Sequence, residues 1–188
     1  MKKLVVSVMI ALSALTAAAL TASAQAENPM VGGAPMYRTR DIIDNAVNSK
    51  DHTTLVAAVK AAGLVDTLKG KGPFTVFAPT NAAFDKLPAG TVDALLKPEN
   101  NGMLKNVLTY HVVAGRYDSD KLMKLIKKGN GSAMLKTVSG GTLTFRMNGM
   151  NGISVTDEKG GTSNVSVANV YQSNGVIHVV DTVLMPGM

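Results

Sequence analysis

The chain of 188 residues contains no cysteine and no tryptophan, and it has only three histidines. Without cysteine the protein can form no disulfide, carry no lipid on a processed N-terminal cysteine and perform no thiol catalysis. Aromatic residues make up 4% of the chain, which argues against a surface that stacks nucleic-acid bases. The three histidines, His52, His111 and His178, lack the close spacing of zinc or iron ligands. The sequence therefore predicts no nucleic-acid partner, no metal and no other cofactor.

The signatures of common catalytic sites are also missing. The chain has no glycine-rich phosphate loop, no nucleophile elbow and no histidine pair of the zinc-hydrolase type. Asp157 and Glu158 are neighbours in a predicted hairpin turn, so they are not an obvious pair of catalytic acid and base. An enzyme would need residues that only folding brings together, and we expect a non-catalytic protein.

Methionine is frequent, with nine examples beyond residue 24. Thioether sulfur favours Cu(I), and Met147 and Met150 are three positions apart. The nine are scattered along the chain, however, and methionine also fills irregular cores. Metal binding by methionine therefore stands as the alternative to ordinary packing.

The first 24 residues have the pattern of a secretory signal peptide. Lys2 and Lys3 precede an apolar stretch from Leu4 to Leu20, and small residues around Ala24 offer a cleavage site. The alternative, an uncleaved membrane anchor, would be at the short end of the length that a bilayer span needs. Cleavage lowers the formal net charge from +6 to +4, because the segment holds two lysines and no acid. No hydrophobic tail closes the chain, so we expect a secreted or periplasmic protein with no membrane span after cleavage.

The remaining residues divide into a leader and one domain. Residues 25–38 contain two prolines and two glycines and no hydrophobic period, which predicts a flexible leader. Residues 39–186 are enough for a single domain with a substantial core.

The first half of this domain has helical spacing. Apolar residues recur three and four positions apart from Thr39 to Leu68, where Thr53 or Thr54 can cap the second helix and Gly63 can end it. A short apolar run, Phe74 to Phe77, predicts a strand. Further helical segments are expected at three places: residues 89–96, 99–108 and 119–129.

The second half of the domain changes to a period of two. Leu143, Phe145 and Met147 alternate with polar residues, as in a strand with one buried face. Similar runs recur up to Val176–Val180, separated by glycine-containing hairpin turns. We therefore predict an α+β domain, an antiparallel β-sandwich or wedge flanked by several helices that come mostly from the N-terminal half.

Three ordered segments resemble those of the fasciclin domain family: TVFAPTNAAFDKLP at residues 75–88, LTYHVV at 108–113 and NGVIHVVDTVLMP at 174–186. The resemblance covers Thr39 to Pro186. It implies a fasciclin-like fold and an extracellular module for adhesion or binding, with cell-surface or matrix proteins or acidic polysaccharides as partners. We expect a monomer. The alternative is a periplasmic protein that binds a small ligand or a metal.

Most of the family pattern has a structural explanation. Thr75 to Phe77 form a core strand, Pro79 ends it, and either Thr80 or Asn81 caps the next helix, from which Phe84 packs inward. In the last segment His178 and Asp181 lie an odd number of residues apart on a strand, so their side chains face opposite sides and share no site.

Two groups of residues are candidates for binding a partner. Tyr110 and His111, with the neighbouring Val107 and Leu108, resemble the stretch that is associated with receptor binding in animal members of the family. The alternative is that both rings are buried and structural.

The second candidate is a basic stripe. Lys121, Lys124 and Lys128 follow helical spacing, while leucine and isoleucine form the opposite face. The stripe is either an ordinary solvated surface or a site for acidic polysaccharide, whose attraction would be sensitive to salt.

Overall fold

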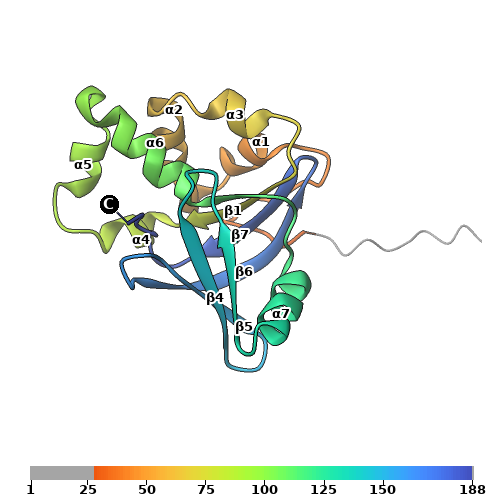
Figure 1. Ribbon diagram of the computed structural model, residues 1–188. Coiled ribbons are helices and arrows are strands. Elements are labelled where there is room, and N and C mark those ends of the chain that lie inside the picture. The colour runs from red at the N-terminus through yellow and green to blue at the C-terminus, as the bar shows by residue number, and fades with distance from the viewer. Residues whose placement is uncertain (1–27, 188) are drawn as a thin grey trace, which may run out of the picture.

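The computed structural model describes residues 28–187. The signal peptide predicted at residues 1–24 therefore lies outside the described residues. Within them, helices from the first half of the chain gather at one end of the sheet, and α7 lies apart beside the β4–β5 hairpin (Figure 1). The α-helices are α1 (Ile42–Ala46), α2 (Thr53–Ala61), α3 (Val65–Lys69), α4 (Asn81–Asp85), α5 (Thr91–Leu95), α6 (Asn101–Tyr110) and α7 (Ser119–Lys128). Two short 3₁₀ helices span Lys50–His52 and Pro98–Asn100.

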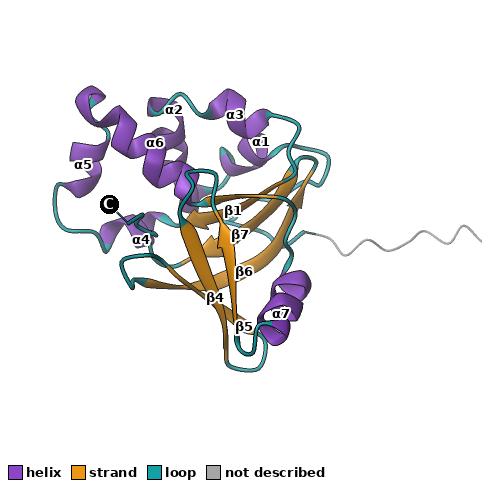
Figure 2. Cartoon of the chain, viewed as in Figure 1, coloured by secondary structure: helices purple, strands orange, loops and turns teal. Residues whose placement is uncertain are grey.

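Within residues 28–187, seven strands form one sheet in the order β2-β1-β7-β6-β5-β4-β3 (Figure 2). They are β1 (Phe74–Pro79), β2 (Val112–Ala114), β3 (Ser132–Lys136), β4 (Thr142–Asn148), β5 (Gly152–Thr156), β6 (Thr162–Gln172) and β7 (Gly175–Val180). The edge strands β2 and β3 approach each other at a bridge between Val113 and Thr137. The sheet is therefore nearly barrel-shaped, and the predicted α+β class is confirmed.

The predicted antiparallel meander holds from β4 to β7, and β3, which was not predicted, extends it. Strand β1, however, pairs with β7 in parallel. Every residue of β7 is buried. Strands buried on both faces read as continuous apolar runs, which is the pattern of VIHVV. The predicted boundary of the β1 strand was short, since it continues to Pro79.

The core has two parts, one on each side of β1 and β7. Successive side chains of a strand point to opposite faces, and accordingly Val76 and Ile177 pack under the helices. Phe77 and Val180 face the other way, into a cluster that includes Leu122 of α7. Residues from these two strands thus hold both halves of the fold together.

Residues 28–38, predicted to be a flexible leader, instead pack on the domain. Val31 and Met36 are buried, each 7% exposed, and the side chain of Asn28 accepts a hydrogen bond from the Tyr171 N–H at 2.9 Å. Gly32 and Gly33, at φ +58° and +74°, form the turn that lets these side chains point inward. The predicted domain start at residue 39 is therefore too late.

The helix caps fit the prediction only in part. Thr80 caps α4, where its hydroxyl accepts from the Ala83 N–H at 3.2 Å. Neither predicted threonine caps α2; instead Asn81, the first residue of α4, accepts from the Thr54 N–H at 3.0 Å. Asn81 also donates to the Lys50 carbonyl at 2.9 Å, so it joins two helices that are distant in sequence.

Candidate functional site

Tyr110 is the last residue of α6, and its side chain is 0% exposed. Its hydroxyl donates to the Thr142 carbonyl at 2.8 Å and accepts from the Glu158 N–H at 3.0 Å. Burial raises the pKa of Tyr110 to about 12. The ring is therefore a neutral link between α6 and two segments of the sheet.

His111 is also buried, at 2% exposure. Its Nε2 accepts from the Leu184 N–H at 3.0 Å, so the proton sits on Nδ1, which donates to the Val107 carbonyl at 2.8 Å. Burial lowers the pKa of His111 to about 4, although the Val107 carbonyl acts in the opposite direction. The imidazole is therefore neutral at pH 7, with both nitrogens engaged.

The stretch around Tyr110 and His111 offers no surface to a partner. Val107 and Leu108 are 4% and 6% exposed and belong to the core under the helices. The structural alternative accounts for all four side chains. No pattern in the sequence could distinguish it from direct contact, because a buried core and a hydrophobic interface have the same composition.

His178 and Asp181 have separate roles, as their spacing predicts. His178 stacks on Phe77 with 5.6 Å between ring centroids, and its Nε2 is 2.8 Å from the Tyr117 carbonyl. Asp181 accepts from the Asn164 N–H at 2.8 Å and from the Ser163 hydroxyl at 3.1 Å. Burial acts to raise the pKa of Asp181, but these hydrogen bonds outweigh it and hold the pKa below its usual value. Neither group is free for chemistry.

Helix α7 presents the predicted lysines to solvent. Leu122 and Ile126 are fully buried, while Lys121, Lys124 and Lys128 are exposed on the other side. The Lys121 ammonium lies 4.3 Å from the centroid of the Tyr117 ring and donates to the Arg116 carbonyl at 3.2 Å, so it is already engaged.

Lys127, which sequence reasoning left out of the stripe, is exposed at the same end of α7 as Lys124 and Lys128. Within residues 28–187, no carboxylate lies close enough to form an ion pair with any of these three lysines. They form the α7 lysine cluster, and their charge is not compensated by an acidic side chain in contact.

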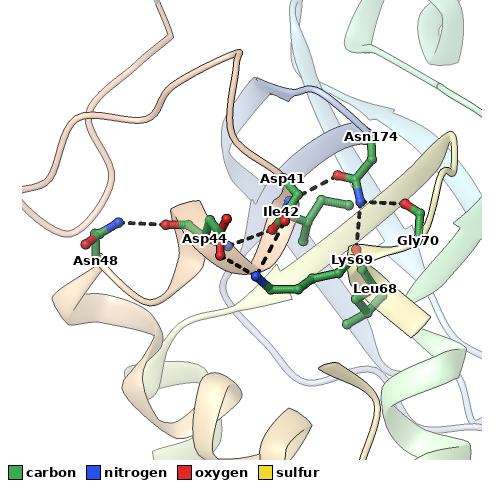
Figure 3. Close-up of polar contacts among 8 residues, drawn as sticks. All are labelled: Asp41, Ile42, Asp44, Asn48, Leu68, Lys69, Gly70 and Asn174. Carbon is green, nitrogen blue, oxygen red and sulfur yellow. Dashed lines mark hydrogen bonds and ion pairs between the residues drawn. The ribbon is translucent and has the colours of Figure 1, made fainter. Parts of the chain in front are cut away.

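A polar groove, not foreseen from the sequence, opens between the start of α1, the loop after α3 and the β6–β7 turn. Its volume is about 610 Å³. Lys69 bridges two carboxylates there, with its Nζ 2.6 Å from Asp44 and 3.7 Å from Asp41 (Figure 3). The hydrogen bond between Lys69 and Asp44 lowers the pKa of Asp44 and raises that of Lys69. Lys69 and the two carboxylates thus form an ion cluster, and Arg40 and Lys71 also line the groove.

Asn174 connects the segments that line the groove through its side-chain amide. Its Nδ2 donates to the carbonyls of Leu68 and Gly70 at 2.7 and 2.9 Å, and its Oδ1 accepts from the Ile42 N–H at 3.0 Å (Figure 3). One buried amide thus joins the β6–β7 turn, α1 and the end of α3. The sequence showed only an Asn-Gly turn at this place.

An apolar cavity of about 50 Å³ lies between the helices and the sheet, lined by residues such as Leu55, Val59 and Ile177. An engineered cavity that binds benzene has a volume of about 150 Å³. His52 borders the cavity and bonds through Nδ1 to the Ser49 hydroxyl at 2.8 Å. The cavity is too small for a ligand of benzene size unless the packing opens, so it gives the small-ligand alternative no support.

The part of the chain that the structure describes holds no cluster of three histidine, aspartate or glutamate side chains that could bind a metal. Four methionines are more than half exposed and come from separate segments: Met30, Met103, Met134 and Met150. In the same range, no helix has the length and apolar character needed to cross a bilayer.

Comparison with known proteins assigns the family. The fasciclin domain model matches residues 50–186. Protein sll1483 of Synechocystis is 45% identical over 149 residues, which cover 78% of this chain and 74% of that protein. The immunogenic protein MPB70 of Mycobacterium bovis is 37% identical over 146 residues, covering 75% of this chain and 66% of the relative. The cell surface glycolipoprotein MPB83 of the same species is 34% identical over 167 residues, covering 86% and 68%.

A solved structure shows the same fold. It is a FAS1 domain pair from the insect cell adhesion molecule fasciclin I, with a TM-score of 0.68 and 21% identity. The match covers 78% of this chain and 51% of the pair, so this chain spans about half of that structure. With the family model and these relatives in agreement, the chain belongs to the fasciclin domain family.

Proposed function

We propose that this protein is a secreted or periplasmic adhesion module that binds acidic polysaccharide at a cell surface or in a matrix and catalyses no reaction. The observation that carries the proposal is the α7 lysine cluster: three exposed ammonium groups that have no carboxylate partner in contact among the described residues. The charge is set on a rigid helix, because Leu122 and Ile126 anchor its opposite face in the core. Such a fixed basic surface attracts a polyanion.

Two comparisons support the cell-surface setting. MPB83 is named a cell surface glycolipoprotein, and the FAS1 pair comes from a cell adhesion molecule. The other two candidate regions suit a polyanion less well, since Tyr110 and His111 are buried and Lys69 of the polar groove is paired with two carboxylates.

The test compares two triple variants of equal charge. Lys124→Glu, Lys127→Glu and Lys128→Glu remove the cluster. Lys71→Glu, Lys97→Glu and Lys105→Glu change three exposed lysines elsewhere and give the same net charge. Retention on immobilised alginate, a polymer of uronic acids, is measured against sodium chloride concentration.

We expect the cluster variant to lose retention at low salt while the control variant keeps most of it. Wild-type retention should fall as salt rises, because screening shortens the range of attraction to about 8 Å at physiological ionic strength. Equal retention of the two variants would refute α7 as the site, and wild-type protein that passes alginate unretained would refute the polysaccharide itself. If alginate does not retain the wild-type protein, attachment of whole cells is measured in its place. Attachment of cells without retention on alginate would indicate a protein partner.

A further inference from the structure

Residues 183–187 cross the fold as an extended segment that follows β7. The N–H of Leu184 donates to His111 Nε2 at 3.0 Å, that of Met185 to Asp157 Oδ2 at 2.9 Å, and that of Gly187 to Glu158 Oε2 at 2.9 Å. Pro186 has no N–H. Every N–H from Leu184 to Gly187 is therefore accepted by a titratable side chain, and none by a backbone carbonyl as in a strand.

The three acceptors are held in place by the rest of the fold. Asp157 accepts from the Gly161 N–H at 2.7 Å, and Glu158 accepts from the Thr142 N–H at 2.9 Å. The backbone N–H of Glu158 donates to the Tyr110 hydroxyl at 3.0 Å. Tyr110 and His111 thus support the segment from one side, and the β5–β6 turn supports it from the other.

We propose that residues 183–187 are a latch that acid releases. Neutral imidazole and ionised carboxylate are hydrogen-bond acceptors, whereas imidazolium has two N–H donors and no acceptor. Protonated His111 would direct an N–H at the N–H of Leu184, and the hydrogen bond that holds Leu184 would be lost. The latch is therefore closed at neutral pH and opens in acid.

Opening uncovers apolar surface at a fixed place. Val183 and Leu184 are 4% and 1% exposed, the first packed in the core under the helices and the second in the core against α7. The segment just before the latch is fastened independently, because the N–H groups of Asp181 and Thr182 donate to Asn164 and Ser163. Release can thus stop at Thr182 and leave the sheet intact.

Among the charged groups around the latch, Asp157 opposes this sign, because its carboxylate raises the pKa of His111, but burial outweighs it. Glu158 faces the latch from the same β5–β6 turn, Tyr110 from α6 is neutral, and Lys86 at the end of α4 donates to the Asp181 carbonyl at 2.6 Å. Burial lowers the pKa of His111 from 6.5 to about 4, so the closed latch binds a proton less well than the open one. Closure is favoured fully above pH 6.5 and loses this contribution as pH falls toward 4.

This linkage sets the size of the effect. With a pKa of about 4 when closed and the free value of 6.5 as the upper limit when open, His111 raises the opening equilibrium constant by up to about 20-fold between pH 7 and pH 5. At pH 4 the upper limit of the increase is about 100-fold.

Amide hydrogen exchange by NMR tests the latch from pH 7 to pH 4.5. We expect the protection factors of Leu184, Met185 and Gly187 to fall by up to about 20-fold by pH 5 and to stay below those of β7, whose exchange needs global unfolding. A His111→Gln variant, whose amide oxygen accepts without titrating, should lose most of this pH dependence. Glu158→Gln should keep a closed latch at pH 7, since it retains an acceptor.

Two outcomes overturn the proposal. Latch amides whose protection factors equal those of β7 at every pH would show that they exchange by global unfolding and not by local release. Latch protection that stays constant down to pH 5 in the wild-type protein would show that acid does not open the segment. If His111→Gln does not fold, the comparison of latch and β7 amides in the wild-type protein and in Glu158→Gln still decides between these outcomes.

Discussion

Replacing Tyr110 by phenylalanine tests whether this residue serves the fold or a partner. The substitution removes one buried hydroxyl and keeps the ring. It leaves the Thr142 carbonyl and the Glu158 N–H without their partner. Two lost hydrogen bonds at about 1 kcal/mol each predict a loss of about 2 kcal/mol in the free energy of unfolding. For a domain of this size that corresponds to a fall of about 4–8 °C in Tm.

Tyr110→Ala also empties the space of the ring. Large aromatic-to-alanine changes in a core cost about 3–5 kcal/mol, and the unpaired groups add to this. The total, about 5 kcal/mol or more, is comparable with the whole stability of many domains. Tyr110→Phe is therefore the informative variant, because it is expected to remain folded.

The assay is urea unfolding at pH 7 followed by far-ultraviolet circular dichroism, together with attachment measured on the folded variant. Tyr37→Phe is the matched control, since Tyr37 is 45% exposed and its change should stay within about 0.5 kcal/mol. If the Tyr110→Phe protein is as stable as wild type but no longer attaches, the structural interpretation is refuted. Direct contact between Tyr110 and the partner would then be the better explanation.

Two further predictions concern buried polar groups. Asn174→Ala removes three hydrogen bonds and should lower the free energy of unfolding by about 3 kcal/mol in urea; a loss below about 1 kcal/mol would show that water replaces the amide. Burial lowers the pKa of His111, His178 and His52, so the free energy of unfolding should decline as pH falls below about 6.5. His111 should contribute up to about 3 kcal/mol of this decline by pH 4. Unfolding midpoints that are constant from pH 7 to pH 5 would contradict this.

The alternating strands of the second half were predictable because one face of each enters the core. Leu143 and Phe145 are fully buried, as the period of two requires. Met147 is only partly buried, but it packs against the same core cluster as Leu143 and Phe145. Strand β3 escaped prediction, since its three central residues are all apolar and Met134, 71% exposed, obscures the alternation.

The candidate site was predictable only where it depends on local spacing. The lysines of α7 follow one helical face, so the sequence predicts them correctly as an exposed group. The latch could not be predicted this way, because its acceptors are 73, 28 and 29 positions from their donors. The burial of residues 28–38 could not be predicted for the same reason, because Val31 and Met36 pack against helices and strands that are distant in sequence.

The latch changes how variants of the Tyr110–His111 pair should be understood in binding studies. Neither ring is exposed, so a substitution there acts on a partner only through what the rings support. His111 holds Leu184 directly, and Tyr110 holds the backbone of Glu158, whose carboxylate holds Gly187. A variant of either residue that weakens attachment should therefore also lower the protection of the latch amides. Loss of attachment with the latch still protected would mean that the pair reaches the partner by a different path, and the α7 lysine cluster would then no longer suffice as the contact.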